Sequence, residues 1–374
     1  MKIAFIINSH TFTAIHRMPL AKFLKQKNHE IIFFIAGNKS GASKVISKEF
    51  IYKIFGMSRS GKNLIDELFS LYQLASLIKN EKPDCVINAT IKPVLYGTLA
   101  SHILGVPKVI NLITGLGSSF INQNGEKIPL KFLIMFLYQL SFFFVKQNVI
   151  FQNKSDLRAI AKYEKGYKAK YHLIPGSGID SSLFHIKPFP KTKRVVYVGR
   201  MIFEKGLQTF IECAQSLYKI RNDISFVMVG PYDKGNPSAI NQDLMNHWTK
   251  HPAIEYWGQE DNIAEVYEKA SIIVLPSLRE GMPKVLMEAG LSGRPVIASN
   301  VPGCKDVVLN EKTGLLFNLN DVNDLETKIL KIIDDSSIMR VMGKDAKNHI
   351  KMNFSTSIVM PKFESIIVGN DKKS

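Results

Sequence analysis

Short apolar runs alternate with longer helical patterns along the whole chain. In the first half, the runs that fit buried strands lie at residues 3–7, 31–35, 85–89, 109–113, 149–151 and 172–174. Helical patterns lie between them at residues 18–27, 62–79 and 93–104. Because such an alternation is typical of parallel α/β sheets, the first half predicts a doubly wound, Rossmann-like domain.

A second series of the same kind follows. Its strand-like runs lie at residues 195–198, 225–229, 254–257, 272–275, 296–298 and 315–317. A polar connector that contains Pro188 and Pro190 separates the two series. We therefore expect an α/β protein with an N-terminal domain over residues 1–187, a C-terminal domain over 188–355, and a helix over 356–374 that packs back toward the first domain.

The stretch after the run at 272–275 has the most specific pattern. Gly281 permits a tight turn, and Pro283 suits the first position of a helix. The free N–H groups of a helix start bind anions, with an effective charge of about half a proton. Glu280 and Glu288 would accept hydrogen bonds from the hydroxyls of two different rings. A role limited to the helix dipole fits these two glutamates equally well.

A second stretch opens the C-terminal series. Arg200 and Lys205 follow the strand-like run at 195–198, so they face the same sheet edge as the helix at Pro283. Arginine binds phosphate through a two-pronged fork and lysine as a point charge. A surface ion-pair cluster of Arg200, Glu204 and Lys205 is the alternative.

Together, a helix start, two cations and two carboxylates fit a diphosphate, a ribose and a sugar. The stretches GRMIFEKG (199–206) and EGMPKVLME (280–288) resemble the G-R-x-x-x-x-K-G and E-G-x-P-x-x-x-x-E motifs of the family 4 glycosyltransferases. In the first domain, residues 16–31, 113–120 and 174–180 resemble bacterial surface-polysaccharide members. These include N-acetylgalactosamine transferases that extend undecaprenyl-diphosphate-linked sugars.

The resemblance implies a GT-B fold, in which two such domains face a central cleft. The implied donor-binding residues are Arg200, Lys205, Gly258, Glu280, Gly281, Met282, Pro283, Lys284 and Glu288. Arg200 and Lys205 would hold the diphosphate and Glu280 the donor sugar, so these three are the expected catalytic residues. Glu288 would bind the ribose hydroxyls.

The implied reaction is a retaining transfer without a covalent enzyme intermediate, in which the departing phosphate oxygen accepts the proton of the acceptor. The donor would be a UDP-linked hexose or N-acetylhexosamine. The acceptor would be a saccharide on a polyprenyl diphosphate, as in O-antigen or capsule synthesis.

On the acceptor side, the candidate residues are His10, His16, Arg17, Thr114, Gly115 and Gly117. Thr114 stands where many members carry a histidine, and residues 8–11 replace the Gly-Gly pair of many members. A structural role is the favoured alternative for both histidines. Arg17 fits an acceptor phosphate or the cap of a carboxylate equally well.

Composition narrows the remaining possibilities. Hydrophobic residues make up 45% of the 374 and charged residues 22%, which is typical of globular domains. Three widely spaced cysteines suit a reducing cytoplasm. No Asp-x-Asp follows an expected strand, and no metal-ligand spacing is found. We expect no metal and no cofactor, with the leaving diphosphate neutralised by Arg200, Lys205 and the helix start.

The excess of 49 Lys and Arg over 32 Asp and Glu, a net charge of +17, implies an anionic partner. RNA-binding and finger motifs are missing, which disfavours nucleic acid. We expect a cytoplasmic protein, peripheral at the inner face of the membrane. The most apolar segment, 130–145, is too short to span a bilayer and is expected to be buried beneath the first sheet.

Two alternatives to a glycosyltransferase remain. One is a nucleotide-sugar 2-epimerase of the same architecture, for which the spacing of Glu280 and Glu288 has no reason. The other is a catalytically silent basic protein that binds membrane surfaces or nucleic acid.

Overall fold

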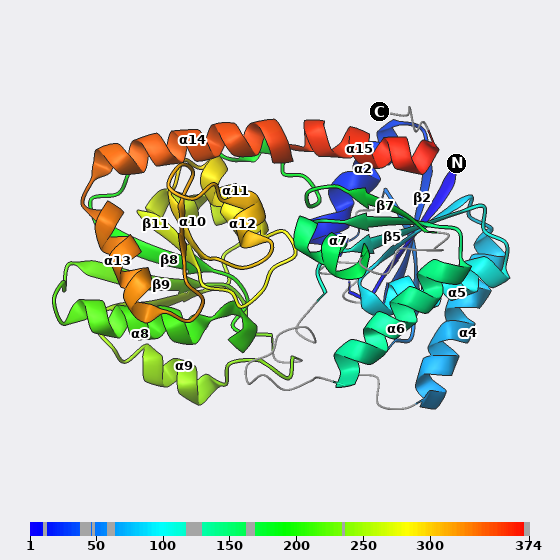
Figure 1. Cartoon of the computed structure of the whole chain (residues 1–374), viewed down its shortest axis with the longest axis horizontal. Helices are drawn as coiled ribbons and strands as arrows, with labels where there is room; N and C mark the ends of the chain where they lie inside the picture. The colour runs from blue at the N-terminus through cyan, green and yellow to red at the C-terminus, as the bar shows by residue number, and fades with distance from the viewer. Residues whose placement is uncertain are drawn as a thin grey trace. The chain divides into compact units, whose positions relative to one another are not determined.

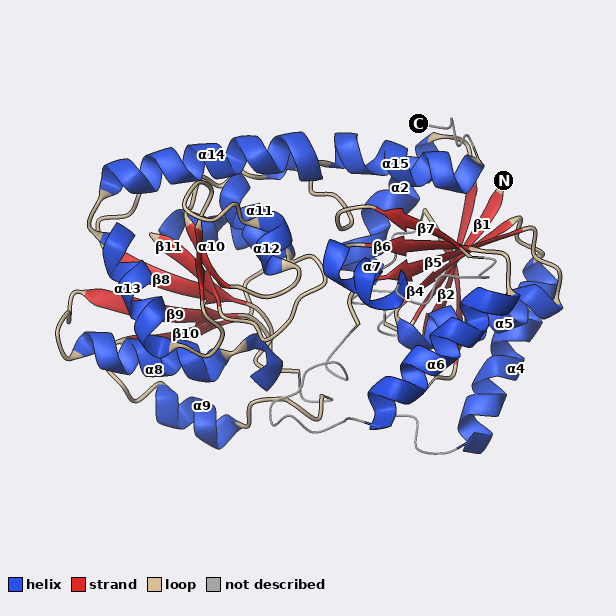
Figure 2. Cartoon of the chain, viewed as in Figure 1, coloured by secondary structure: helices blue, strands red, loops and turns tan. Residues whose placement is uncertain are grey.

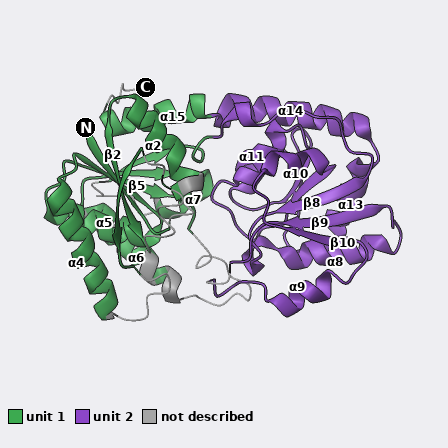
Figure 3. Ribbon diagram, turned by 180° about the vertical axis from the view of Figure 1, so that it is seen from behind, with its two compact units in different colours: residues 1–178, 356–374 green, residues 179–355 purple. Residues whose placement is uncertain are grey.

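The computed structural model describes residues 1–9, 13–37, 46, 49–57, 64–116, 129–161, 169–233 and 236–369 (Figure 1) and contains two series of alternating strands and helices (Figure 2). The chain forms two compact units (Figure 3). Unit 1 contains residues 1–178 and 356–374, and unit 2 contains residues 179–355. In the described chain, no helix is both long and apolar enough to cross a bilayer.

The boundary between the units falls earlier than the expected one after residue 187. Ile179 and Phe184 precede the proline-containing connector, yet both are buried in the core of unit 2. The C-terminal helix α15 (Thr356–Val368) belongs to unit 1, where Val359, Phe363 and Ile367 are buried with the sheet. The connector is therefore a surface segment of unit 2 rather than the border between the units.

Unit 1 is built on a seven-stranded sheet in the order β3-β2-β1-β4-β5-β6-β7, with every pair parallel. The strands are β1 (Lys2–Ile7), β2 (Glu30–Ala36), β3 (Ile51–Phe55), β4 (Cys85–Ala89), β5 (Lys108–Ile113), β6 (Asn148–Phe151) and β7 (Lys170–Leu173). All the expected strands are present, and the edge strand β3 is an addition. Strands β2 and β3 are added on one side of β1, and β4 to β7 are added on its other side, so the order reverses between β1 and β4.

Helices cover both faces of this sheet (Figure 2). They are α2 (Met18–Gln26), α4 (Leu64–Glu81), α5 (Ile91–Ile103), α6 (Pro129–Phe144), α7 (Lys154–Ala161) and α15, with a π-helical turn η1 (Thr13–Arg17) before α2. Alternate residues of β1 point to opposite faces. Phe5 packs in the cluster that contains residues of α2 and α15, and Ile6 in the cluster that contains residues of α4 and α5.

The end of α15 is bound to the sheet by a lysine. Lys108 Nζ, at the start of β5, donates to the carbonyl oxygens of Ile367 at 2.8 Å and Ile366 at 3.4 Å. The last carbonyls of a helix have no partner within the helix and carry partial negative charge. A cation at this position therefore stabilises the return of the chain to unit 1.

Unit 2 is built on a six-stranded parallel sheet in the order β10-β9-β8-β11-β12-β13. The strands are β8 (Lys193–Val198), β9 (Ile224–Val229), β10 (Ile254–Gly258), β11 (Ile272–Leu275), β12 (Val296–Ser299) and β13 (Leu315–Phe317). The helices are α8 (Leu207–Tyr218), α9 (Gln242–Trp248), α10 (Ile263–Lys269), α11 (Lys284–Leu291), α12 (Cys304–Val307), α13 (Val322–Ile333) and α14 (Ser336–Phe354), and two short 3-10 turns are η3 (Ser181–Leu183) and η4 (Phe203–Lys205).

The order of the strands in unit 2 locates its ligand site. The chain runs from β8 outward to β10 and then returns to β11 on the other side of β8. In open parallel sheets, ligands bind beyond the carboxyl ends of the strands at such a switch point. The loops that follow β8 and β11 are therefore the first places to look for a site.

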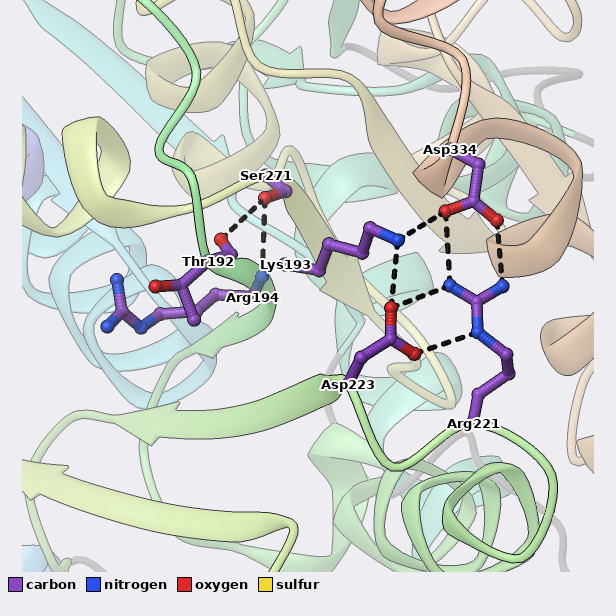
Figure 4. Close-up of polar contacts among 7 residues, drawn as sticks. All are labelled: Thr192, Lys193, Arg194, Arg221, Asp223, Ser271 and Asp334. Carbon is purple, nitrogen blue, oxygen red and sulfur yellow. Dashed lines mark hydrogen bonds and ion pairs between the residues drawn. The ribbon is translucent and has the colours of Figure 1, made fainter.

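The opposite end of the unit 2 sheet is held by a network of four charged side chains (Figure 4). Arg221 Nε donates to Asp223 Oδ1 at 2.8 Å, and Arg221 Nη1 donates to Asp334 Oδ2 at 2.7 Å. Lys193 Nζ lies 2.8 Å from Asp223 and 2.7 Å from Asp334. The hydrogen bonds from Arg221 and then Lys193 lower the pKa of Asp334 to about 2 and hold that of Asp223 well below its usual value.

This network predicts a loss of stability in acid. Because the folded-state pKa values are depressed, the stabilisation is present above the ordinary aspartate pKa of about 4 and is lost as the pH falls toward about 2. The side chains are partly exposed, so Asp334→Asn should cost only about 1 kcal/mol at neutral pH. Both tryptophans, Trp248 and Trp257, lie in unit 2, so their fluorescence during urea unfolding measures this unit.

The matched control is Asp261→Asn, an exposed aspartate outside the network. It should leave both the midpoint and its pH dependence unchanged. An Asp334→Asn protein that matches the parent at neutral pH would show that the network contributes no stability.

Candidate active site

The loops after β8 and β11 contact each other at the switch point of unit 2. The backbone N–H of Leu278 donates to the carbonyl of Glu204 at 2.9 Å. Gly206 has a left-handed backbone with φ of 70°, and a Cβ at this position would lie 2.0 Å from the carbonyl oxygen of Pro276. Only glycine permits this approach. The two motifs identified in the sequence are thus neighbours in the fold.

Glu280 is fixed by side chains from both loops. Lys205 Nζ donates to its Oε1 at 2.5 Å, and Ser277 Oγ donates to the same oxygen at 2.7 Å. The backbone N–H of Glu280 donates to the carbonyl of Pro302 at 3.2 Å. Gly303, with φ of 85°, passes so close that a Cβ would lie 2.6 Å from the carbonyl oxygen of Glu280. The carboxylate is therefore oriented before any ligand arrives.

Arg200 lies on the loop after β8 that also carries Lys205, and a buried side chain holds its backbone. Its carbonyl oxygen accepts a hydrogen bond from the hydroxyl of the fully buried Tyr197 at 2.8 Å. Its guanidinium donates from Nη1 to Asp233 Oδ2 at 2.6 Å, while 47% of the side chain remains exposed. The alternative of an ion-pair cluster among Arg200, Glu204 and Lys205 is wrong, because the two cations pair with Asp233 and Glu280 instead.

The helix after β11 starts slightly later than expected. Its first residue is Lys284, and Pro283 is the N-cap residue, because its ψ of 111° is extended rather than helical. The side chain of Met282 is buried in the core of unit 2, so only its main chain faces the turn. The N–H groups of the first turn of α11 remain at the carboxyl end of the sheet.

Glu288 lies one turn into α11 and is also held in place. The hydroxyl of Tyr267 donates to Glu288 Oε2 at 2.8 Å, and Lys284 Nζ lies 3.5 Å from Oε1. Tyr267 comes from α10 and is fully buried, which raises the pKa of its phenol well above the usual value. It is therefore a permanent donor to Glu288 at neutral pH.

Gly258 ends β10 at the same edge of the sheet. Its φ is 78°, and a Cβ built on it meets nothing within 4 Å. Its carbonyl accepts from the backbone N–H of Gly230 at 2.7 Å. The structure therefore brings all nine donor-side residues predicted from the sequence to the carboxyl ends of β8, β10 and β11 and the first turns of α11.

In unit 1, the described acceptor-side candidates also follow strands. His16 and Arg17 belong to η1 after β1, and Thr114 and Gly115 follow β5. Arg17 is fully buried, and the loss of solvent lowers the pKa of its guanidinium to about 9. It is still a cation at neutral pH. His10 and Gly117 lie outside the described residues.

Several neighbours of these residues could not be found from the sequence. Tyr267 and Asp233 bind the motif residues from other strand–helix units. Thr90 follows β4, which lies between β1 and β5, and has a φ of 79° that is rare for a β-branched residue. Among the described residues, no group of three His, Cys, Asp or Glu side chains is arranged to hold a metal ion.

Two family models match the chain. The model for glycosyl transferases group 1 matches residues 192–335, and the model for a glycosyl transferase 4-like domain matches residues 2–153. The chain belongs to the family 4, or group 1, glycosyltransferases. This confirms the predicted family, enzyme class and architecture of two parallel α/β domains.

Relatives of this glycosyltransferase resemble it along nearly its whole length. It is 29% identical to the N,N'-diacetylbacillosaminyl-diphospho-undecaprenol alpha-1,3-N-acetylgalactosaminyltransferase of Campylobacter jejuni, over 92% of this chain and 93% of the relative. It is 26% identical to the UDP-Gal:alpha-D-GlcNAc-diphosphoundecaprenol alpha-1,3-galactosyltransferase of Escherichia coli, over 95% and 93%.

Solved structures share its fold at low identity. Sucrose-phosphate synthase from Thermosynechococcus elongatus superposes with a TM-score of 0.84 at 18% identity, over 100% of both chains. HepE of Anabaena, in complex with UDP and glucose, superposes with a TM-score of 0.81 at 16% identity, over 99% of this chain and 100% of that one. Both are similar in fold.

The packing of Gly303 against Glu280 gives a prediction. In Gly303→Ala the new methyl group displaces the Glu280 loop, so we expect transferase activity to fall by about tenfold or more, with a loss of about 1–3 kcal/mol in stability. Initial rates and urea unfolding measure the two effects. The control is Gly105→Ala in unit 1, where φ is 68° but a Cβ meets nothing within 4 Å. It should lose stability only, and equal activities of the two variants would contradict the proposed constraint.

Proposed function

We propose that this enzyme transfers a hexose or N-acetylhexosamine from a UDP-sugar to a saccharide on a polyprenyl diphosphate, with retention of the anomeric configuration, in surface polysaccharide synthesis. The observation that carries the proposal is the contact of Lys205 with Glu280 at the switch point of unit 2, on the loop after β8 that also carries the half-exposed Arg200. The activities for which the Campylobacter and Escherichia relatives are named support the substrate class.

The donor diphosphate would exchange with the carboxylate partners of the two cations. Arg200 would leave Asp233 and bind the phosphate oxygens. Lys205 would share its hydrogen bonds between Glu280 and the phosphate oxygens. Charge then develops on the departing diphosphate where two cations and the first N–H groups of α11 are already oriented, which is the largest source of rate enhancement in such reactions. This arrangement neutralises the leaving group without a need for a divalent cation.

The two glutamates would divide the sugars of the donor between them. Glu280, with the main chain at Gly281, Met282, Pro283 and Lys284, accepts hydrogen bonds from the transferred sugar. Glu288, oriented by Tyr267, accepts them from the ribose. Gly258 borders the nucleobase. A charged acceptor oxygen forms stronger hydrogen bonds than a neutral one, so each carboxylate adds both affinity and orientation.

The chemical step follows from these roles. The bond between the anomeric carbon and the phosphate oxygen breaks, and the acceptor oxygen bonds to the same face of the sugar. The acceptor proton passes to the departing phosphate oxygen, so no side chain needs to form a covalent intermediate. Glu280 is already bound by Lys205 and Ser277, which suits a residue that positions the sugar rather than a nucleophile.

The acceptor diphosphate would bind unit 1 near Arg17. A buried cation interacts with a multiply charged phosphate far more strongly than an exposed one does, because water screens it less. His16, Thr114 and Gly115 follow strands at the same edge and would line the acceptor saccharide, together with His10 and Gly117. A lipid-linked acceptor requires the enzyme to work at the anionic inner face of the membrane.

The test is an assay of UDP release with a panel of UDP- and GDP-sugars and a synthetic polyprenyl-diphosphate sugar. We expect release that depends on a UDP-sugar and on the acceptor, is insensitive to EDTA, and gives an α-linked product by NMR. Epimerised nucleotide sugar without transfer would support a 2-epimerase instead. A glycosyl adduct on Glu280, detected by mass spectrometry, would overturn the mechanism.

Removal of the Lys205 cation should show whether this lysine binds the donor diphosphate or only forms a structural ion pair. Lys205→Ala should lower kcat by about 100-fold to 1,000-fold, as the loss of a charge-stabilising donor does in other enzymes. The matched control is Lys219→Ala, an exposed lysine at the end of α8. It should retain parental kcat and KM. A Lys205→Ala enzyme with the parental kcat would show that the lysine only supports the fold.

A further inference from the structure

The net charge of the protein is confined to one unit. Unit 1 contains 27 Lys and Arg against 11 Asp and Glu, a net charge of +16. Unit 2 contains 22 against 21, a net charge of +1. If the excess positive charge served only to bind the nucleotide donor, it would lie in unit 2, where the proposed donor site is. Its confinement to unit 1 indicates a second, larger anionic partner for that unit.

Unit 1 also exposes a stripe of apolar side chains along α6. Phe132 and Phe136 are 58% and 59% exposed, and Leu140 and Phe143 follow at helical spacing on the same side. On the opposite side of the helix, Phe142 is fully buried against the sheet. The prediction that residues 130–145 are buried is therefore wrong for the side of the helix that carries Phe132 and Phe136.

The helix α5, which packs against α6, and the next helix α4 also expose apolar side chains. The helices α4, α5 and α6 pack side by side (Figures 1 and 3). Their exposed large apolar residues are Ile65, Leu68, Phe69, Tyr72, Leu99, Ile103 and Leu104. Surface apolar residues are ordinary when they are scattered, but a continuous face of them marks an interaction site.

One carboxylate on these helices is neutralised by a neighbouring helix. Glu67, at the start of α4, is paired with Lys92 of α5 at 2.6 Å and accepts a hydrogen bond from Tyr96. This pairing keeps a carboxylate on the face from opposing an anionic partner. Unit 2 differs, because Phe203 is the one aromatic side chain among its exposed large apolar residues in the described chain.

Part of this face lies near the end of the sheet where the acceptor-side candidates are found. In a parallel sheet each crossover helix begins near the carboxyl ends of the strands. Phe69 of α4 and Phe136 of α6 belong to the first halves of their helices, and these halves extend in the same direction in Figure 1. They are therefore nearest the sheet edge at which Arg17 and Thr114 lie.

We propose that the face formed by α4, α5 and α6 docks on an anionic lipid bilayer, into which the aromatic side chains of α4 and α6 insert. Aromatic and aliphatic side chains on a surface helix bury themselves at the boundary of headgroups and acyl chains, and nearby cations add attraction to anionic lipids. A second copy of the chain fits less well, because two units of charge +16 repel each other.

This inference rests on the proposed function in one respect, since a lipid-linked acceptor gives the docking its purpose. The membrane places the polyprenyl diphosphate in the headgroup layer. An enzyme that docks through α4 and α6 brings the acceptor loops of unit 1 to that layer, while the water-soluble donor reaches unit 2 from solution.

The test is sedimentation of the whole protein with phosphatidylglycerol-containing vesicles and with pure phosphatidylcholine vesicles, at low and high salt. We expect strong binding to the anionic vesicles that weakens with salt, and weaker binding to the neutral ones. Phe132→Ser with Phe136→Ser should reduce binding to the anionic vesicles by about tenfold or more. The control pair, Val341→Ser with Met352→Ser on α14 of unit 2, removes equally exposed apolar groups and should bind as the parent does.

A tryptophan probe gives a second measurement that does not depend on a destabilising change. Unit 1 has no tryptophan, so Phe136→Trp places one on the face. Vesicles with bromine-labelled acyl chains should quench this tryptophan and should leave Val341→Trp on α14 unquenched. Equal quenching of the two, or unchanged vesicle binding of the double serine variant, would overturn the proposal, and so would a dimer that the serine variant dissociates without loss of vesicle binding.

Activity with two forms of the acceptor separates this inference from the proposed function. With a short-chain, water-soluble acceptor, the double serine variant should retain the parental kcat/KM. With the long-chain acceptor in vesicles, its activity should fall together with its binding. If no lipid-linked acceptor is used at all, the proposed function fails, while the vesicle measurements still decide the docking face.

Discussion

Lys205 and Glu280 lie 75 residues apart in the chain, yet their side chains are 2.5 Å apart. This contact exists because β8 and β11 are neighbours at the point where the sheet of unit 2 reverses its order. Gly206 and Gly303 let the two loops approach where any side chain would collide. The rest of the proposed donor site depends on this approach, since it fixes Glu280 between Lys205 and Ser277.

The two units differ in their net charge and in the apolar surface that they expose. Unit 2 has almost no net charge, because its 22 Lys and Arg are balanced by 21 Asp and Glu, and the two cations at its proposed donor site, Arg200 and Lys205, are each paired with a carboxylate. Unit 1 carries nearly all of the excess charge, buries the Arg17 cation near the acceptor loops, and exposes apolar helices. A small anion is bound by a few oriented cations. An extended anionic surface is bound by a diffuse positive charge together with apolar side chains that insert into it.

Much of this could be predicted from the sequence because local patterns determine it. Buried parallel strands are continuous apolar runs, so β1 and β11 were recognisable, whereas the edge strand β3, only partly buried, was missed. Apart from Gly258, the proposed donor residues lie in two short contiguous stretches, 199–206 and 280–288, so their spacing can be recognised in the sequence alone. The partners were not found, because Asp233 and Tyr267 reach Arg200 and Glu288 from distant segments. The exposure of Phe136 was also missed, since an apolar helix has the same composition whether it is buried or docks on a membrane.

The most direct test of the central claim is calorimetric titration of the parent, Lys205→Ala and Glu280→Gln proteins with UDP and with the UDP-sugar they use. If Lys205 holds the diphosphate and Glu280 the sugar, Lys205→Ala should weaken the binding of both ligands by about tenfold or more. Glu280→Gln should weaken the UDP-sugar and leave UDP nearly unchanged. Parental affinity of both variants for both ligands would contradict the assignment of the donor site to the contact between these two residues.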